Sequence, residues 1–210
     1  MGMSVNTNVG AMLALQNLNK SNKMLETTQL HITTGLKVNG PKDDAATYAI
    51  AQRMRGDIAG MGAVKTALSN GEATVNVAIT AGKAVADMLT EMKAKTVQAN
   101  QAGLDTASKD ALQNDFTSLR DQLTTIVQTA EFNGKNLITS TATSLTVLST
   151  VDGSTISVAA QKLDTTTLGI NASNISSGAS AALVAIDAAI NTVTSSLASL
   201  GSSSKRIDVQ

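Results

Sequence analysis

Residues 50–92 read IAQRMRGDIAGMGAVKTALSNGEATVNVAITAGKAVADMLTEM. Alternating steps of four and three residues along this stretch meet apolar residues or glycine everywhere except at Asp57. Such spacing is typical of a coiled-coil seam, because about 3.5 residues per turn keep one stripe facing a partner helix. As a proline-free helix the stretch would reach roughly 60 Å at about 1.5 Å per residue, so it has to bury its stripe against other long helices. The stripe consists of Ile50, Met54, Asp57, Met61, Val64, Leu68, Gly71, Val75, Ala78, Gly82, Val85, Leu89 and Met92.

The composition favours packed helices over a ligand pocket. The 210-residue chain carries 16 basic and 16 acidic side chains, so no net charge draws it to nucleic acid or to a membrane surface. Aromatic residues make up 1% of the chain and cysteine is absent, which disfavours aromatic-lined pockets and excludes disulfides and thiolate metal sites. Polar residues interrupt every apolar run, so we expect no membrane insertion. Lysine and arginine are dispersed and are not interleaved with aromatic residues, so we expect no nucleic-acid partner.

A first amphipathic helix is predicted over residues 4–36. Its stripe contains Asn22, which either fixes the register of a buried seam or lies on a frayed face. The segment has no partner of its own in the sequence, so we expect it to be marginally stable until it meets one. The stripe consists of Leu15, Leu18, Asn22, Leu25, Gln29 and Ile32.

A break is predicted between this helix and the long one. Gly35, Gly40 and Pro41 supply turn chemistry, and either Asp43 or Asp44 is placed to cap the long helix.

A second rod helix is predicted after a break at Gly103, capped by Asp105 or Thr106. It should run back antiparallel to the long helix and end at Phe132-Asn133-Gly134, with the glycine as a left-handed stop. Its stripe consists of Leu112, Phe116, Leu119, Leu123, Ile126 and Ala130.

The segment 139–177 is rich in serine and threonine. Alternating apolar residues on either side of Asp152-Gly153 predict a β-hairpin. A last helix is predicted from Gly178, and its stripe still runs where the sequence ends at Gln210, so we expect a helix that is cut short and a chain truncated at its C-terminus. That stripe consists of Leu183, Ile186, Ile190, Val193, Leu197, Leu200, Ser204 and Ile207.

These elements predict a mainly α fold: a long, antiparallel, coiled-coil-like helical rod with a small β-hairpin element at one end. We expect four parts: a terminal-helix segment over residues 1–40, rod helices over 41–138, the Ser/Thr-rich β element over 139–177, and a C-terminal rod helix over 178–210.

No catalytic, cofactor or metal site is predicted. His31 is the single histidine, so neither a paired-histidine zinc site nor a Ser-His-Asp arrangement has enough parts, and we expect an ordinary surface or seam residue there. Glycine-rich phosphate loops are also absent, so we expect a protein that is not an enzyme and needs no cofactor.

Several motifs make the chain resemble the bacterial flagellins over nearly its whole length. The most distinctive is GLKVNGPKDDAA at residues 35–46, followed by Ala49-Ile50. Val5-Asn6-Thr7-Asn8, Glu131-Phe132-Asn133-Gly134 and Ser204-Lys205-Arg206-Ile207 also fit, and the short hydroxyl-rich middle is similar to that of small alphaproteobacterial flagellins.

The resemblance implies a structural subunit of the extracellular flagellar filament, which self-assembles for motility. It also implies type III export without a cleaved signal peptide, and an export chaperone and hook-associated or cap proteins as partners. Independently of the resemblance, the hydroxyl-rich surface of 139–177 could accept glycans on its serine and threonine residues. Two alternatives stay open: a hook–filament junction protein, and a surface adhesin that binds a glycan or receptor. The candidate self-association residues are Leu15, Leu18, Asn22, Leu25, Ile32, Met54, Met61, Leu68, Val75, Leu89, Phe116, Leu123, Ile190 and Leu197.

Residues 89–98 are similar to the rod-helix motif by which a vertebrate Toll-like receptor detects flagellins. Glu91 stands where that motif has an arginine, and Lys95 where it has an apolar residue. The candidate receptor-facing residues are Leu89, Glu91, Lys95 and Gln98, and the charge reversal predicts weak or absent receptor activation.

Overall fold

A computed structural model describes residues 8–210, so the expected helix start at residue 4 and the motif residues 5–7 lie outside the described part. The chain divides into two compact units, Met1–Ala59 and Gly60–Gln210. The boundary between the two units falls inside a helix.

The first unit contains helix α1, Val9–Thr34, and the start of helix α2, Ala45–Ala99. The side chain of Asn8 caps α1 by accepting the backbone N–H of Ala11 at 3.1 Å. Gly35 ends the helix in the left-handed conformation, at φ 67°, which glycine adopts without a steric penalty. None of the residues of α1 is buried.

Asp44, not Asp43, caps α2. Its Oδ1 accepts the backbone N–H groups of Ala46 at 3.0 Å and Thr47 at 3.1 Å. Asp43 instead closes the preceding turn, because its Oδ2 accepts the N–H groups of Asn39 at 2.9 Å and Gly40 at 3.2 Å.

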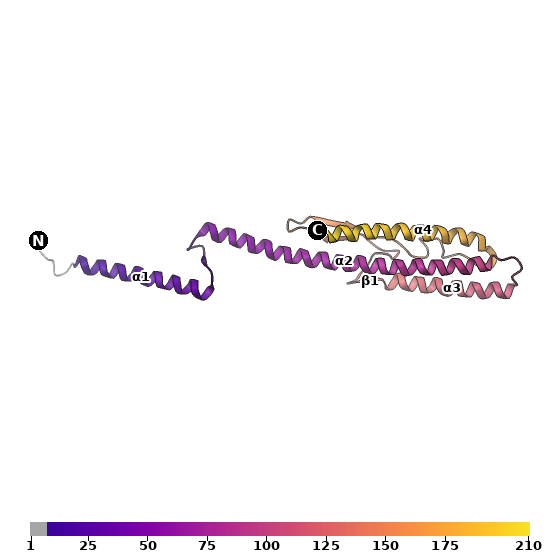
Figure 1. Ribbon diagram of the computed structural model, residues 1–210, viewed down its shortest axis with the longest axis horizontal. Coiled ribbons are helices and arrows are strands. Elements are labelled where there is room, and N and C mark those ends of the chain that lie inside the picture. The colour runs from indigo at the N-terminus through magenta and orange to yellow at the C-terminus, as the bar shows by residue number, and fades with distance from the viewer. Residues whose placement is uncertain (1–7) are drawn as a thin grey trace. The chain divides into compact units, whose positions relative to one another are not determined.

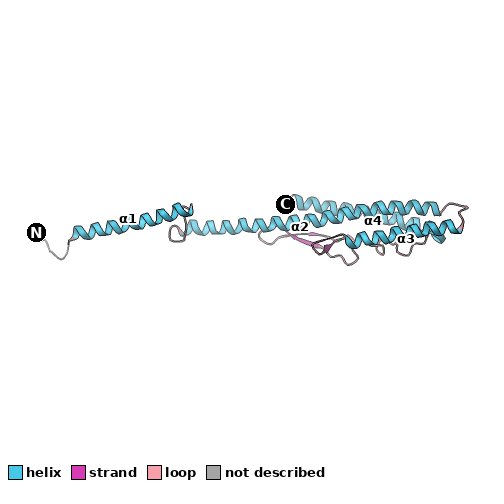
Figure 2. Ribbon diagram, turned by 90° about the horizontal axis from the view of Figure 1, so that it is seen from below, coloured by secondary structure: helices cyan, strands magenta, loops and turns pink. Residues whose placement is uncertain are grey.

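The second unit is built on three helices that lie side by side (Figures 1 and 2): the part of α2 from Gly60 onward, α3, Thr106–Thr129, and α4, Ile175–Asp208. Asp105 caps α3 by accepting the N–H of Ser108 at 3.2 Å, after Gly103 has turned the chain at φ 92°. Ion pairs from α2 reach both neighbours, with Lys95 at 2.7 Å from Asp115 of α3 and Lys93 at 2.6 Å from Asp187 of α4. The predicted antiparallel return of α3 along α2 is confirmed.

The seam of α2 is confirmed only in part. It is buried or half-buried at every predicted position from Val64 to Met92, whereas Ile50, Met54, Asp57 and Met61 are exposed. On α4, Ile186, Val193, Leu200 and Ile207 are buried as predicted. The other predicted positions of the α4 stripe, Leu183, Ile190, Leu197 and Ser204, are half-buried. The buried residues beside them are small: Ala182, Ala189, Ser196 and Ser203.

Two predicted helix boundaries are wrong. Residues 132–134 do not end α3, which stops at Thr129; β1, Glu131–Phe132, instead pairs antiparallel with β2, Lys135–Asn136, around a turn in which Asn133 and Gly134 both have positive φ. Such a pair suits a two-residue hairpin. The helix α4 begins at Ile175 with Asn174 as its cap, and Gly178 is a kink with φ −142° and ψ 42°.

The predicted hairpin is confirmed. Strand β3, Leu145–Leu148, pairs antiparallel with β4, Thr155–Val158, and Val147 faces Ile156 in the register. Gly153 lies in the connecting loop at φ 91°.

The loops around this hairpin contribute core residues that the sequence pattern did not indicate. The N–H of Leu163 donates to the carbonyl of Ile138 at 2.8 Å, which pins residues 161–163 alongside 137–138. Ile138 and Leu163 are fully buried against the helices. Leu137, Leu168 and Ile170 are buried in the same core.

Within residues 8–210, α4 is the one helix that is long and apolar enough to cross a membrane by length and composition. The sequence pattern had suggested none. Its buried stripe belongs to the core formed with α2 and α3.

Two glycines of α2, Gly71 and Gly82, let other elements approach the helix closely. A Cβ atom added at Gly71 would lie 2.5 Å from Cγ2 of Val147 in β3, and one at Gly82 would lie 2.9 Å from Cδ2 of Leu197 in α4. At Gly71 the added atom would also lie 3.0 Å from Cγ1 and 3.4 Å from Cβ of Val147, so the approach of β3 depends on the missing side chain there. At Gly82 the close atom is the end of the flexible Leu197 side chain, which can move, so the glycine constrains α4 less strictly.

We therefore expect Gly71→Ala to lower the free energy of unfolding by about 1–3 kcal/mol, because the new methyl group pushes β3 away from α2. Gly62→Ala is the matched control: it lies in the same helix with no neighbouring heavy atom within 4 Å of the added Cβ. That control should raise stability by about 1 kcal/mol. Urea unfolding measures both, and equal effects would contradict the close-packing role.

Candidate self-association surface

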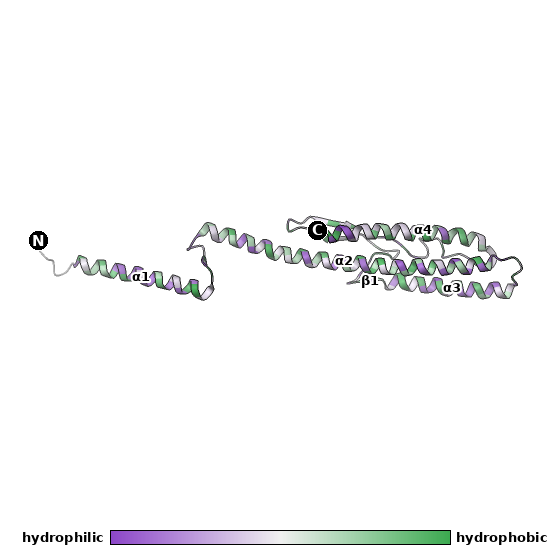
Figure 3. Ribbon diagram, viewed as in Figure 1, coloured by the Kyte–Doolittle hydropathy of each residue, from purple (hydrophilic) through white to green (hydrophobic). Residues whose placement is uncertain are grey.

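The helix α1 exposes apolar side chains along its whole length. Those of Leu15, Leu18 and Leu25 are 56–59% exposed, and that of Ile32 is 76% exposed. Figure 3 shows apolar and polar residues alternating along this helix. The sequence pattern missed further members of this surface, because they lie beside the 3-4 stripe instead of on it: Val9, Met12, Leu13, Met24 and Leu30.

The beginning of α2 is similarly uncovered. Ile50 and Met54 are each 61% exposed, and Ile58 is 68% exposed. Met61, at the start of the second unit, is also 61% exposed. Contiguous exposed apolar side chains of this size mark a surface that binds another protein segment.

The predicted self-association residues fall into three groups. Leu15, Leu18, Asn22, Leu25, Ile32, Met54 and Met61 are exposed and remain candidates. Leu68, Ile190 and Leu197 are half-buried against the core of the second unit. For Val75, Leu89, Phe116 and Leu123 the prediction is wrong, because all four are 0% exposed and form the core of the chain itself.

The candidate receptor-facing residues are also divided by burial. Leu89 is fully buried, so a receptor-facing role for its side chain is wrong. Glu91 and Gln98 are exposed on α2. The ammonium group of Lys95 is held at 2.7 Å from Asp115, which reduces its freedom to meet an outside partner.

The turn between α1 and α2 is organised by carboxylates. The N–H of Asn39 holds the pKa of Asp43 below its usual range, and the N–H of Gly40 and the side chain of His31 act in the same direction, against the opposing effect of burial. Nε2 of His31 lies 3.5 Å from Oδ2 of Asp43. The hydroxyl and N–H of Thr47 lower the pKa of Asp44 in the same way.

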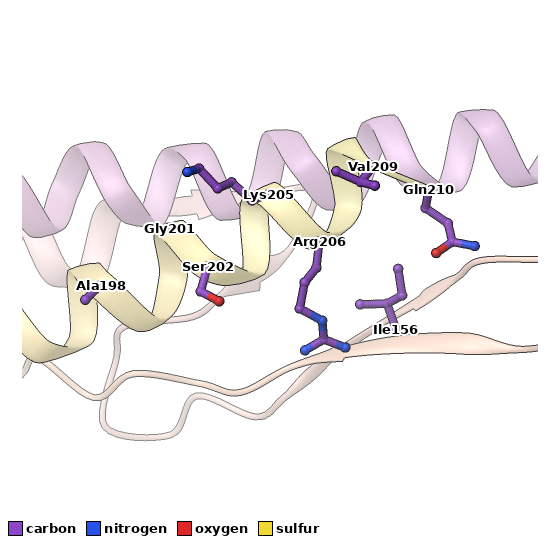
Figure 4. Close-up of a pocket in the computed structure, with 8 residues that line it drawn as sticks. All are labelled: Ile156, Ala198, Gly201, Ser202, Lys205, Arg206, Val209 and Gln210. Atoms are coloured by element: carbon purple, nitrogen blue, oxygen red, sulfur yellow. The ribbon is translucent and has the colours of Figure 1, made fainter.

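An open groove of about 920 Å³ lies at the end of α4 (Figure 4). Ile156 of β4 lines it on one side, and Val209 lies at its α4 side. Neither Lys205 nor Arg206, which also line it, forms a salt bridge within residues 8–210. The same part of the chain contains no group of three or more His, Cys, Asp or Glu side chains that could hold a metal ion.

Comparison with known proteins identifies the family of this chain. The family model described as the bacterial flagellin N-terminal helical region matches residues 5–143. Flagellin FljM of Caulobacter vibrioides is 42% identical over 208 residues, which cover 98% of this chain and 76% of that protein. The chain belongs to the bacterial flagellin family. This flagellin is therefore a structural subunit of the flagellar filament, which is extracellular, and the junction-protein and adhesin alternatives are not favoured.

Solved structures agree with this fold. The crystal structure of Bacillus cereus flagellin is similar with a TM-score of 0.61 at 21% identity, over 67% of this chain and 84% of that one. A structure described as a flagellar hook-associated protein from Vibrio parahaemolyticus gives a TM-score of 0.66 at 16% identity, over 81% and 92%. At these identities, both comparisons support the helical architecture alone.

The Asp44 cap predicts a pH dependence at the start of α2. Since the folded-state pKa of Asp44 is lowered, its contribution to stability is present above the unfolded pKa and is lost as the pH falls below about 4. Protection of the amides of residues 45–49, taken relative to their intrinsic exchange rates, should fall over that range. Asp44→Asn should keep the cap and lose this pH dependence of protection, whereas Asp44→Ala should show weak protection at every pH. Strong protection in the alanine variant would contradict the cap.

Proposed function

We propose that this flagellin divides its two tasks between two parts of the chain. Residues 60–210 fold on their own core and form the body of the subunit. The helix α1 and the exposed start of α2 bind neighbouring subunits in the filament. Bacterial flagellins are a structural protein family, and we propose that this member has no enzymatic activity.

One observation carries the proposal: α1 buries none of its 26 residues, while the second unit has a continuous core. An isolated helix of this length is marginal in water, because nucleation is costly and propensity alone barely sustains it. Its exposed leucines and isoleucine therefore need a partner, and self-assembly into a filament supplies one.

The proposed roles of the two parts also extend to the four segments predicted from the sequence. We propose that residues 1–40 act as the filament-core segment, 41–138 and 178–210 as the rod helices, and 139–177 as an outward-facing β element. The exposed hydroxyl groups of Thr141, Thr143 and Ser157 support the last assignment and could accept glycans.

Other partners follow from the same exposed stripe. An apolar surface that is uncovered before assembly has to be shielded, which supports an export chaperone, and the filament end supports hook-associated and cap proteins as partners. We propose export through the flagellar type III apparatus without a cleaved signal peptide.

The contact surface can be tested by placing a charge on α1. Leu18→Asp and Leu25→Asp should each raise the critical concentration for filament growth by about tenfold or more, because an unpaired carboxylate in an apolar contact is costly. The measurement is sedimentation of protein grown on short filament seeds, with filament length in cells as a second readout.

Ser21→Asp is the matched control, since it adds the same charge to an exposed polar position of the same helix. It should assemble nearly as the wild type does. Neither class of substitution should change the unfolding of residues 60–210. Normal filament growth by both leucine variants would show that α1 is not part of the contact surface.

Receptor activation gives a separate test of the 89–98 region. We expect weak activation of the Toll-like flagellin receptor by purified protein in reporter cells, because exposed Glu91 reverses a charge in the contact motif. Glu91→Arg should increase the response, and Glu91→Gln should have a smaller effect. Potent activation by the unmodified chain would contradict this assignment.

A further inference from the structure

The methionines within residues 8–210 of this flagellin fall into two groups with opposite environments. Met12, Met24, Met54 and Met61 are 61–65% exposed, whereas Met88 is 7% and Met92 0% exposed. The exposed group lies on α1 and at the uncovered start of α2, and the protected group lies in the core of the second unit. The same residue type therefore occurs in the proposed contact surface and in the folded body.

We propose that the four exposed methionines are oxidation sites at which a two-electron oxidant of the peroxide class controls assembly of the free subunit. The inference rests on the proposed contact role of α1 and the start of α2. It assigns to these sulfur atoms a modification that acts before assembly and leaves the folded body intact.

The chemistry needs only an accessible thioether. The sulfur attacks one oxygen of hydrogen peroxide, an S–O bond forms, and the O–O bond breaks. The proton on the transferred oxygen passes to the departing hydroxide, which leaves as water. Sulfur is oxidised by two electrons and the peroxide is reduced, so the product is methionine sulfoxide.

Position makes this product disruptive. Met12 lies three residues before Leu15, on one face of α1, and Met54 belongs to the apolar stripe predicted for α2. A sulfoxide changes a flexible apolar side chain into a polar one, which opposes burial in a helix-to-helix contact. Met88 and Met92 are shielded by the core, so folding protects them from the same reagent.

The test uses flagellin released from filaments as monomers. The protein is exposed briefly to hydrogen peroxide, the oxidant is removed, and oxidised positions are mapped by mass spectrometry. We expect sulfoxide at residues 12, 24, 54 and 61, but at 88 and 92 only after unfolding in urea. The critical concentration for regrowth on filament seeds should rise about tenfold, and a methionine sulfoxide reductase should restore it.

A variant with leucine at all four exposed positions is the matched control. Leucine keeps the apolar volume and removes the sulfur. Whatever the critical concentration of this variant before treatment, peroxide should leave that value unchanged. Loss of assembly by the treated variant would overturn the inference, since another group would then be responsible. Unchanged assembly of wild-type protein oxidised at these positions would overturn it too, as would their resistance to peroxide.

The untreated Leu18→Asp and Leu25→Asp variants separate the two proposals. If both grow normally, the proposed contact role of α1 fails without any reference to oxidation. If they are blocked while oxidised wild-type protein grows normally, the contact role stands and the methionine inference fails.

Discussion

The stripe of α2 between Val64 and Ala99 is the surface on which the rest of the second unit depends. Both α3 and α4 bury their own stripes against it, and the β3–β4 hairpin reaches it at Gly71. Dispersion contacts and the hydrophobic effect along this stripe are non-directional. They favour packing of the other elements against α2, but they do not fix where along α2 each element lies. Position is set by the missing side chains of Gly71 and Gly82 and by the ion pairs of Lys93 and Lys95.

The same helix is self-sufficient over one part of its length and incomplete over another. Its apolar stripe continues toward the N-terminus through Met54 and Ile50 without a change of period, but those side chains remain exposed. A filament subunit needs both properties. In the function proposed above, the covered part keeps the subunit folded before assembly, and the uncovered part supplies the apolar surface for the next copy.

Sequence periodicity predicted the helices, the antiparallel return of α3 and the β3–β4 hairpin. It could not separate Leu89, in the core, from Met54, on the surface, because a seam within a chain and a seam between chains have the same period. From sequence alone, the glycine of Asn133-Gly134 predicts a helix stop. The structure has a hairpin turn there, because residues with positive φ occur at helix ends and in hairpin turns alike.

Other core residues had no periodic signal. Leu137, Ile138, Leu163 and Ile170 occur as short apolar groups in Ser/Thr-rich loops, and burial there depends on where the loops cross the helices. The small residues of α4, such as Ala182 and Ser196, were missed for a different reason. A close helix contact needs little volume, so hydrophobicity alone underrates them.

The absence of buried residues in α1 has a consequence for when polymerisation can begin. Free subunits that meet in solution must each order a helix that has no tertiary support, and several must do so together before any contact compensates for the lost entropy. A subunit arriving at an existing filament end meets helices that are already ordered. The proposed contact role of α1 therefore implies that spontaneous nucleation is slow relative to elongation, which would keep concentrated subunits dispersed until they reach a growing tip.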